Sequence, residues 1–189
     1  MKQNLYLTLT ALIILTVIFA NRDIGVRPVP ELHKVGNFTL TDSNQNLFRF
    51  DQLKGKIVVV DFIFTTCQGV CPLMTQNLKK IYEQFRNKTD VAFLSITVNP
   101  EYDTPAVLAK YSERLNINPN QWVFLTGPRD VIQTIAVNEF KIGSVDEPVF
   151  HSAYFVLVDK QGVARGYYEG SEAAQIQKLV VDIKRLRKG

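Results

Sequence analysis

The chain's 189 residues include only two cysteines, Cys67 and Cys71, with three residues between them. A structural disulfide is one explanation, but closing so short a loop would add only about 2 kcal/mol of stability on a chain-entropy model. Thiolates also exchange disulfides and bind soft metal ions. The common dithiol redox motif has two intervening residues, and a third residue here lets both sulfurs turn toward one external point. That arrangement suits Cu(I), although zinc accepts the same ligands.

Histidine could supply a third ligand, and the chain contains only His33 and His151. His33 lies in a segment with two prolines, where we expect solvent exposure. His151 stands just before an apolar run at residues 153–158. If that run pairs antiparallel with a strand at residues 57–64, it begins at the sheet edge where the earlier strand ends. His151 would then face Cys67 and Cys71; the antiparallel direction is an assumption at this point.

The elements around the cysteines predict an exposed site at the edge of a sheet. Residues 57–64 (IVVVDFIF) form an apolar, β-branched run typical of a strand buried on both faces. A helix follows, with Pro72 suited to its first turn and apolar residues at helical spacing through residue 85. Open α/β sheets place ligands where such strands end. A helix N-terminus also lowers the pKa of a nearby thiol.

The rest of the chain continues the alternation of strands and helices. Further strands are expected at residues 37–41, 47–50, 91–98, 122–125, 153–158 and 166–168. Helices are expected from Thr104–Pro105, an N-cap and first-turn pair, to about residue 115, and at residues 131–140 and 171–187. A hairpin, βαβα units and a closing hairpin with a helix predict an α/β sandwich on one central sheet.

The N-terminal region differs from the rest of the chain. Residues 5–20 carry no charge and are almost entirely apolar. This run is slightly short for a membrane span and long for the core of a signal peptide. We favour a retained anchor at residues 1–20 over a cleaved signal, because Ile18 would occupy a cleavage position that prefers a small residue. Residues 21–35 are expected to form an extended tether, and residues 36–189 the domain.

The overall charge argues against one class of partner. The formal net charge of +4 and the sequence pI near 9.0 are mild, and the charges are dispersed. A nucleic-acid partner is therefore not expected. The basic residues near the C-terminus complement the negative end of a helix.

Three separate stretches together resemble the SCO (SenC) family. They are the run at residues 60–67 with Cys71-Pro72, the run at residues 100–105 (PEYDTP), and His151. Members are membrane-anchored, thioredoxin-fold copper chaperones that assist assembly of the dinuclear copper site of cytochrome c oxidase. The resemblance covers about residues 36–189, and the anchor and tether match the family plan.

The resemblance implies a fold, a ligand set and partners. The fold would be a thioredoxin-like three-layer sandwich with a central mixed β-sheet and an N-terminal β-hairpin. Cys67, Cys71 and His151 would bind one copper ion, Cu(I) or Cu(II), and the two cysteines could also form a disulfide. The partners would be the copper-bearing subunit of cytochrome c oxidase, and a thiol reductant or another copper carrier. The domain would lie in the periplasm or an equivalent extracytoplasmic space.

Two positions differ from the family's usual sequence, and two further residues, Asp61 and Met74, could contribute to the site without being predicted ligands. The family usually has Asp where Asn99 stands, and a proline or acidic residue where Gln68-Gly69 stands. Asp61 on the buried strand either moves protons near the thiols or faces outward at a strand edge. Met74 could offer a soft sulfur, but its helical spacing indicates a core residue.

Three functions remain open at this stage. The leading one is a metallochaperone, which binds copper and is not an enzyme. The second is a thiol–disulfide oxidoreductase acting on cysteines of an oxidase subunit, for which Cys67 and Cys71 would be catalytic. The third is a thiol peroxidase, which ranks last because no Arg lies near the cysteines in sequence to activate one of them.

Overall fold

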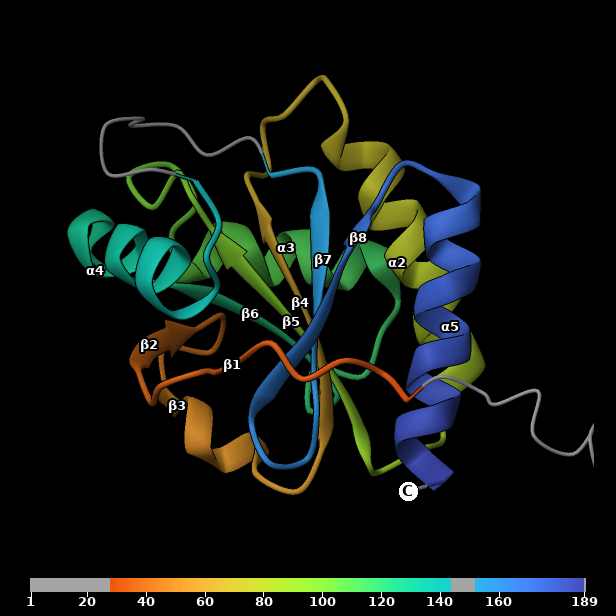
Figure 1. Ribbon diagram of the computed structural model, residues 1–189. Coiled ribbons are helices and arrows are strands. Elements are labelled where there is room, and N and C mark those ends of the chain that lie inside the picture. The colour runs from red at the N-terminus through yellow and green to blue at the C-terminus, as the bar shows by residue number, and fades with distance from the viewer. Residues whose placement is uncertain (1–27, 144–151, 189) are drawn as a thin grey trace, which may run out of the picture.

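The chain folds around one mixed β-sheet of eight strands (Figure 1). The computed structural model describes residues 28–143 and 152–188. Its strand order is β1-β8-β7-β4-β5-β6-β2-β3. The strands are β1 (His33–Lys34), β2 (Thr39–Asp42), β3 (Leu47–Arg49), β4 (Ile57–Ile63), β5 (Val91–Thr97), β6 (Trp122–Thr126), β7 (Tyr154–Val158) and β8 (Val163–Glu169).

The helices account for most of the remaining described residues. They are the 3₁₀ helix η1 (Phe50–Leu53), α2 (Cys71–Phe85), α3 (Pro105–Leu115), α4 (Arg129–Thr134), the π-helix η2 (Ile135–Glu139) and α5 (Ala173–Lys188). Thr104 caps α3 as predicted, because its hydroxyl accepts the backbone N–H of Val107 at 3.4 Å. Within these residues, no helix is both long and apolar enough to cross a membrane. The predicted anchor at residues 1–20 lies outside them.

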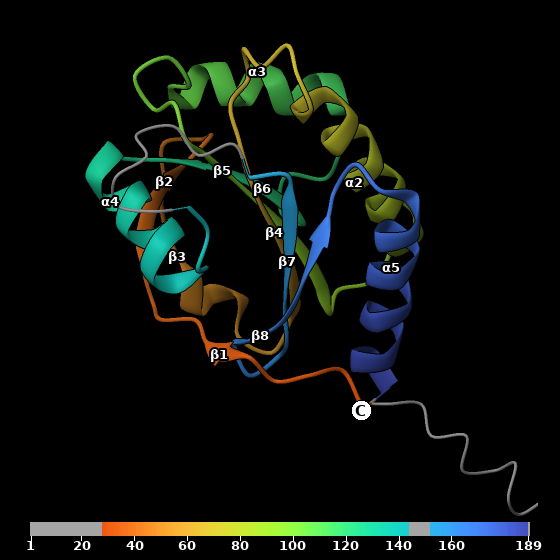
Figure 2. The ribbon, with the colours of Figure 1, turned by 45° about the horizontal axis from the view of Figure 1, so that its top comes forward.

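Strand β4 lies at the centre of the sheet, and all seven of its residues are buried. It pairs parallel with β5, with Asp61 opposite Ser95. It pairs antiparallel with β7, with Val60 opposite Val156. The antiparallel direction that the sequence left as an assumption is therefore correct. As a result, the end of β4 and the beginning of β7 lie at the same edge of the sheet (Figure 2).

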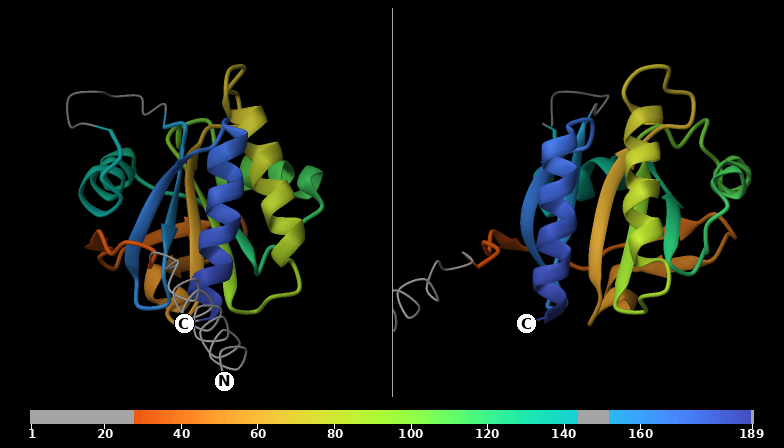
Figure 3. Two further views of the ribbon diagram at one scale, coloured as in Figure 1. Left: turned by 45° about the vertical axis from the view of Figure 1, so that its right-hand side comes forward. Right: turned by 90° about the vertical axis from the view of Figure 1, so that its right-hand side faces the viewer.

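The two faces of the sheet are covered by different elements. Helices α2, α3 and α5 pack on one face, over a core that includes Leu78, Trp122 and Leu179. The hairpin β2–β3, η1, α4 and η2 cover the other face, where Phe38, Phe50 and Phe140 pack together. Figure 3 shows α2 and α5 side by side on their face of the sheet. This is the predicted three-layer sandwich with its N-terminal hairpin.

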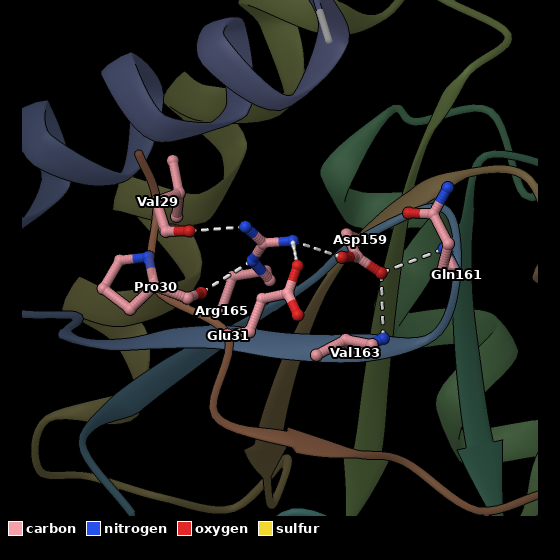
Figure 4. Close-up of polar contacts among 7 residues, drawn as sticks. All are labelled: Val29, Pro30, Glu31, Asp159, Gln161, Val163 and Arg165. Atoms are coloured by element: carbon pink, nitrogen blue, oxygen red, sulfur yellow. Dashed lines mark hydrogen bonds and ion pairs between the residues drawn. The ribbon is translucent and has the colours of Figure 1, made fainter. Parts of the chain in front are cut away.

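Residues 28–35, expected to belong to a free tether, instead pack on the domain. Val29 and Val35 are buried, and β1 pairs with β8. Figure 4 shows the cause: the guanidinium of Arg165 on β8 donates to the carbonyl oxygens of Val29 and Pro30 and pairs with Asp159 at 2.6 Å. This arginine therefore supplies hydrogen-bond donors to two backbone carbonyls of the segment. The chain therefore packs on the domain before Gly36, from Val29 onward.

Candidate functional site

The two cysteines lie where β4 ends and α2 begins. Cys67 is half-buried in the connecting turn, and its backbone N–H donates to the carbonyl of Phe64 at 3.2 Å. Cys71 is the first residue of α2 and is 8% exposed. Both thiols are free, and they hydrogen-bond to each other. The structure thus brings the two predicted cysteines together in the reduced, dithiol form. Cys67 is the more accessible of the two.

The two thiols have opposite electrostatic environments. Burial disfavours the thiolate of Cys67, but hydrogen bonds from the thiol of Cys71 and from the N–H groups of Cys71 and Gly69 outweigh it, so the pKa of Cys67 is lowered. Burial and the neighbouring Cys67 raise the pKa of Cys71 to about 12. The helix N-terminus therefore does not make Cys71 acidic. Cys67 is the thiol that ionises first, and Cys71 is the proton donor beside it.

A carboxylate from the loop after β5 holds the turn that carries Cys67. Asp103 is fully buried and accepts three hydrogen bonds. The N–H of Thr65 donates to it at 3.0 Å, the hydroxyl of Thr97 at 2.5 Å, and the hydroxyl of Thr65 also donates to it. From the sequence this stretch was expected to cap a helix and to carry part of the family resemblance, and no role was predicted for Asp103 itself. An acidic residue in a loop at the carboxyl edge of the sheet was the available signal.

Asp61 lies inside the domain and not at an exposed strand edge. It is 1% exposed, and its Oδ1 accepts the hydroxyl of Ser95 at 2.5 Å. Ser95 in turn accepts the indole N–H of Trp122 at 2.8 Å. The other oxygen, Oδ2, has no partner among the described residues. Burial, opposed by the bond from Ser95, raises the pKa of Asp61 to about 7, and its charge also disfavours ionisation of Cys71.

The other candidate ligands are His151, His33 and Met74, and only the last two lie among the described residues. His151 lies outside the described residues, as do the seven residues before it. The strand that follows it, β7, begins at the edge reached by β4. His33 lies on β1 and contacts the carbonyl of Glu139 at 2.8 Å, away from the cysteines. Met74 is 1% exposed and packs in the core as predicted.

No group of three side chains from His, Cys, Asp and Glu is positioned to hold a metal ion within residues 28–143 and 152–188. The cysteines contribute two sulfurs there. The predicted third ligand, His151, lies outside the described residues.

Solved structures of other proteins share this fold. The SCO1/SenC family lipoprotein of Bacillus anthracis is 31% identical, with a TM-score of 0.73 over 82% of this chain and 95% of that one. BsSco, described as a member of the Sco family of cytochrome c oxidase assembly proteins with a disulfide switch, is 30% identical, with a TM-score of 0.73 over 84% and 96%. Yeast Sco1, solved with copper bound, is 26% identical, with a TM-score of 0.64 over 82% and 90%.

The sequence comparison covers nearly the whole described chain. The family model SCO1/SenC matches residues 27–188, which include the turn of Cys67, the start of α2, the Asp103 loop and β7. The chain belongs to the SCO1/SenC family.

Proposed function

We propose that the protein is a copper metallochaperone that binds one copper ion through Cys67, Cys71 and His151. The observation that carries this proposal is the pair of free, mutually hydrogen-bonded thiols at the end of β4, beside the start of β7. Soft thiolates select Cu(I). Metal loading must displace both thiol protons. The lowered pKa of Cys67 makes its proton the first to leave, and the pKa of about 12 makes the proton of Cys71 the second.

Copper is the cargo in this proposal, and its recipient is the copper-bearing subunit of cytochrome c oxidase. Support comes from BsSco, which is named among assembly proteins of that enzyme, and from yeast Sco1, which was solved with copper bound. We also propose that residues 1–20 anchor the domain to a membrane with the domain on the extracytoplasmic side. The Bacillus anthracis relative is a lipoprotein, which supports attachment to a membrane.

Competition titration of Cu(I) tests the ligand set. The reduced full chain, held in nanodiscs of phosphatidylcholine, would be titrated anaerobically against a Cu(I) chelator. We expect one tightly bound Cu(I), and about ten-fold or greater weakening in His151→Ala, on the scale of losing one metal-ligand contact. His33→Ala is the matched control, because it removes the other histidine from a site on β1. Equal affinity in the two histidine variants would contradict the three-ligand site.

The electrostatics of the pair also favour a second function, reduction of disulfides in an oxidase subunit. The Cys67 thiolate would attack the partner's disulfide and release one partner thiolate, which takes a proton. Cys71, after losing its proton, would attack the mixed disulfide and release the second thiol. The partner is reduced by two electrons, and Cys67–Cys71 becomes a disulfide that an external thiol reductant must restore. Asp61, buried beside this chemistry, is a candidate acceptor for the proton of Cys71.

The two functions separate at His151. A reductase needs both cysteines and tolerates loss of the histidine. Rates of disulfide reduction in a cysteine-bearing peptide would therefore stay at the native value in His151→Ala while Cu(I) affinity falls. If His151→Ala leaves Cu(I) affinity unchanged and Cys67→Ser abolishes disulfide reduction, the oxidoreductase becomes the preferred function.

A further inference from the structure

A pocket of about 290 Å³ lies at the end of β4 opposite the cysteines. It is close in size to the smaller ligand sites of proteins. The turn between β7 and β8, β1 and η1 form its walls. Its apolar lining consists of five buried side chains, Val35, Phe50, Leu53, Val58 and Val158. These side chains are 0–7% exposed, so they form the apolar floor of the pocket.

Backbone hydrogen bonds fix the walls of the pocket to one another. The N–H of Val35 donates to the carbonyl of Gly162 at 2.9 Å, which joins the segment after β1 to the β7–β8 turn. The N–H of Gly55 donates to the carbonyl of Lys160 at 3.0 Å, which joins the residues after η1 to the same turn. Because both connections are main-chain bonds, the pocket is preformed, and a ligand need not order the walls.

The lining of the pocket carries three lysines and two aspartates. Asp51 and Asp159 also line it, but they pair with Arg49 and Arg165 respectively. Three lysines of the lining form no salt bridge with the described residues, namely Lys34, Lys54 and Lys160. Ammonium groups on flexible stems can reach an anion at the mouth while their methylenes cover apolar surface. An acidic group next to an apolar chain matches this distribution.

We propose that this pocket binds an amphiphile with an acidic head group and a single acyl chain. The chain would lie on the apolar lining, and the head would be bound by the three lysines. A purely apolar ligand would gain nothing from the lysines, and a small anion would gain nothing from the apolar lining. The proposed site shares no residue with the cysteine pair, so it stands independently of copper binding.

Methyl NMR of the full chain in phosphatidylcholine nanodiscs tests the proposal. Decanoate is the probe, and decanol is the neutral probe of equal chain length. We expect saturable shifts of the methyl groups of Leu53, Val58 and Val158 with decanoate, and affinity for decanol lower by about ten-fold or more. Absence of saturable shifts, or equal affinity for the two probes, would overturn the proposal.

Lysine variants locate the head group without disturbing the core. The variant with Lys34, Lys54 and Lys160 all changed to Gln should weaken decanoate binding by about ten-fold or more. A control with three exposed lysines outside the pocket lining changed to Gln, Lys88, Lys110 and Lys184, has the same net charge and should stay within about two-fold of the native affinity. Equal weakening in both triple variants would show general electrostatic attraction and overturn the site.

The same measurement separates two sources of the ligand. Nanodiscs that contain phosphatidylglycerol offer the acidic head and acyl chain as part of a membrane lipid. Shifts of the same three methyl groups in these discs, lost in the Lys34/Lys54/Lys160 variant, would show that a diacyl membrane lipid occupies the pocket and would overturn the single-chain ligand. Shifts with free decanoate alone would assign a monoacyl ligand.

Discussion

The carboxylate of Asp103 accepts the backbone N–H of Thr65 at 3.0 Å, and Thr65 lies two residues before Cys67. This contact joins the loop after β5 to the turn after β4, 38 residues earlier in the chain. It fixes the backbone from which the accessible thiol projects. Asp103 is therefore a positioning residue, which acts on the site through Thr65 and not through contact with a ligand.

We expect Asp103→Ala to destabilise the domain and weaken Cu(I) binding together. Three donors of Thr65 and Thr97 lose their acceptor. The hydroxyl of Thr97 is buried, and leaving a buried group unsatisfied costs on the order of 1–3 kcal/mol. Urea unfolding and Cu(I) competition would measure the two effects. Glu101→Ala is the matched control from the same loop, because that side chain is exposed and pairs with Arg129 at the surface. Unchanged copper affinity in Asp103→Ala would contradict the positioning role.

Asp61 should make the folded state less stable as the pH rises toward neutrality. Its folded pKa of about 7 lies above the value near 3.9 of an unfolded aspartate, so the folded state holds the proton longer. The stability present below the unfolded pKa is lost between about pH 4 and 7, by up to roughly 4 kcal/mol for this one group.

The variant Asp61→Asn should remove this part of the pH dependence. Urea unfolding of the reduced chain in a nonionic detergent, at pH 5 and pH 8, can be followed by the fluorescence of Trp122, the only tryptophan. We expect the variant to gain stability relative to the native chain at pH 8 more than at pH 5. Asp130→Asn, on the exposed first turn of α4, should keep the native pH slope. A parallel slope in both variants would refute the assignment.

Alkylation should distinguish the two thiols. At pH 7, iodoacetamide should modify Cys67 well before Cys71, because the pKa of Cys67 is lowered and that of Cys71 is about 12. Replacing Cys71 by Ala removes the hydrogen-bond donor and should move the pH midpoint of Cys67 alkylation upward. Cys71→Ser retains a donor and should preserve more of the low midpoint. Identical midpoints in the two variants would show that Cys71 does not stabilise the Cys67 thiolate.

Loss of Arg165 should release the N-terminal segment from the domain. Its side chain is 12% exposed and pairs with Asp159, which is 5% exposed, so removal leaves a buried carboxylate without its cation. We expect Arg165→Met to cost about 3 kcal/mol of unfolding free energy and to accelerate hydrogen exchange at residues 29–35. Arg49→Met, which breaks the exposed pair with Asp51, should leave exchange there unchanged. Exchange that stays slow in Arg165→Met would show that β1 pairing alone holds the segment.

The sequence by itself determined the elements and the chemical class of the site. The apolar run of β4, the helical spacing of α2 and the cap at Thr104 are local patterns, and local steric and hydrophobic preferences are enough to specify them. The same holds for the cysteine pair, because its spacing and its place between a strand and a helix depend only on neighbouring residues. Resemblance then supplied the family.

Only the tertiary structure decided which distant residues support the site. The antiparallel pairing of β7 with β4, the reach of Asp103 to Thr65 and the attachment of residues 28–35 through Arg165 each join segments far apart in the chain. The unequal pKa values of Cys67 and Cys71, and the raised pKa of Asp61, depend on burial and on partners brought together by folding. Such contacts have no local signal, because they form only when the whole sheet and its covering layers assemble.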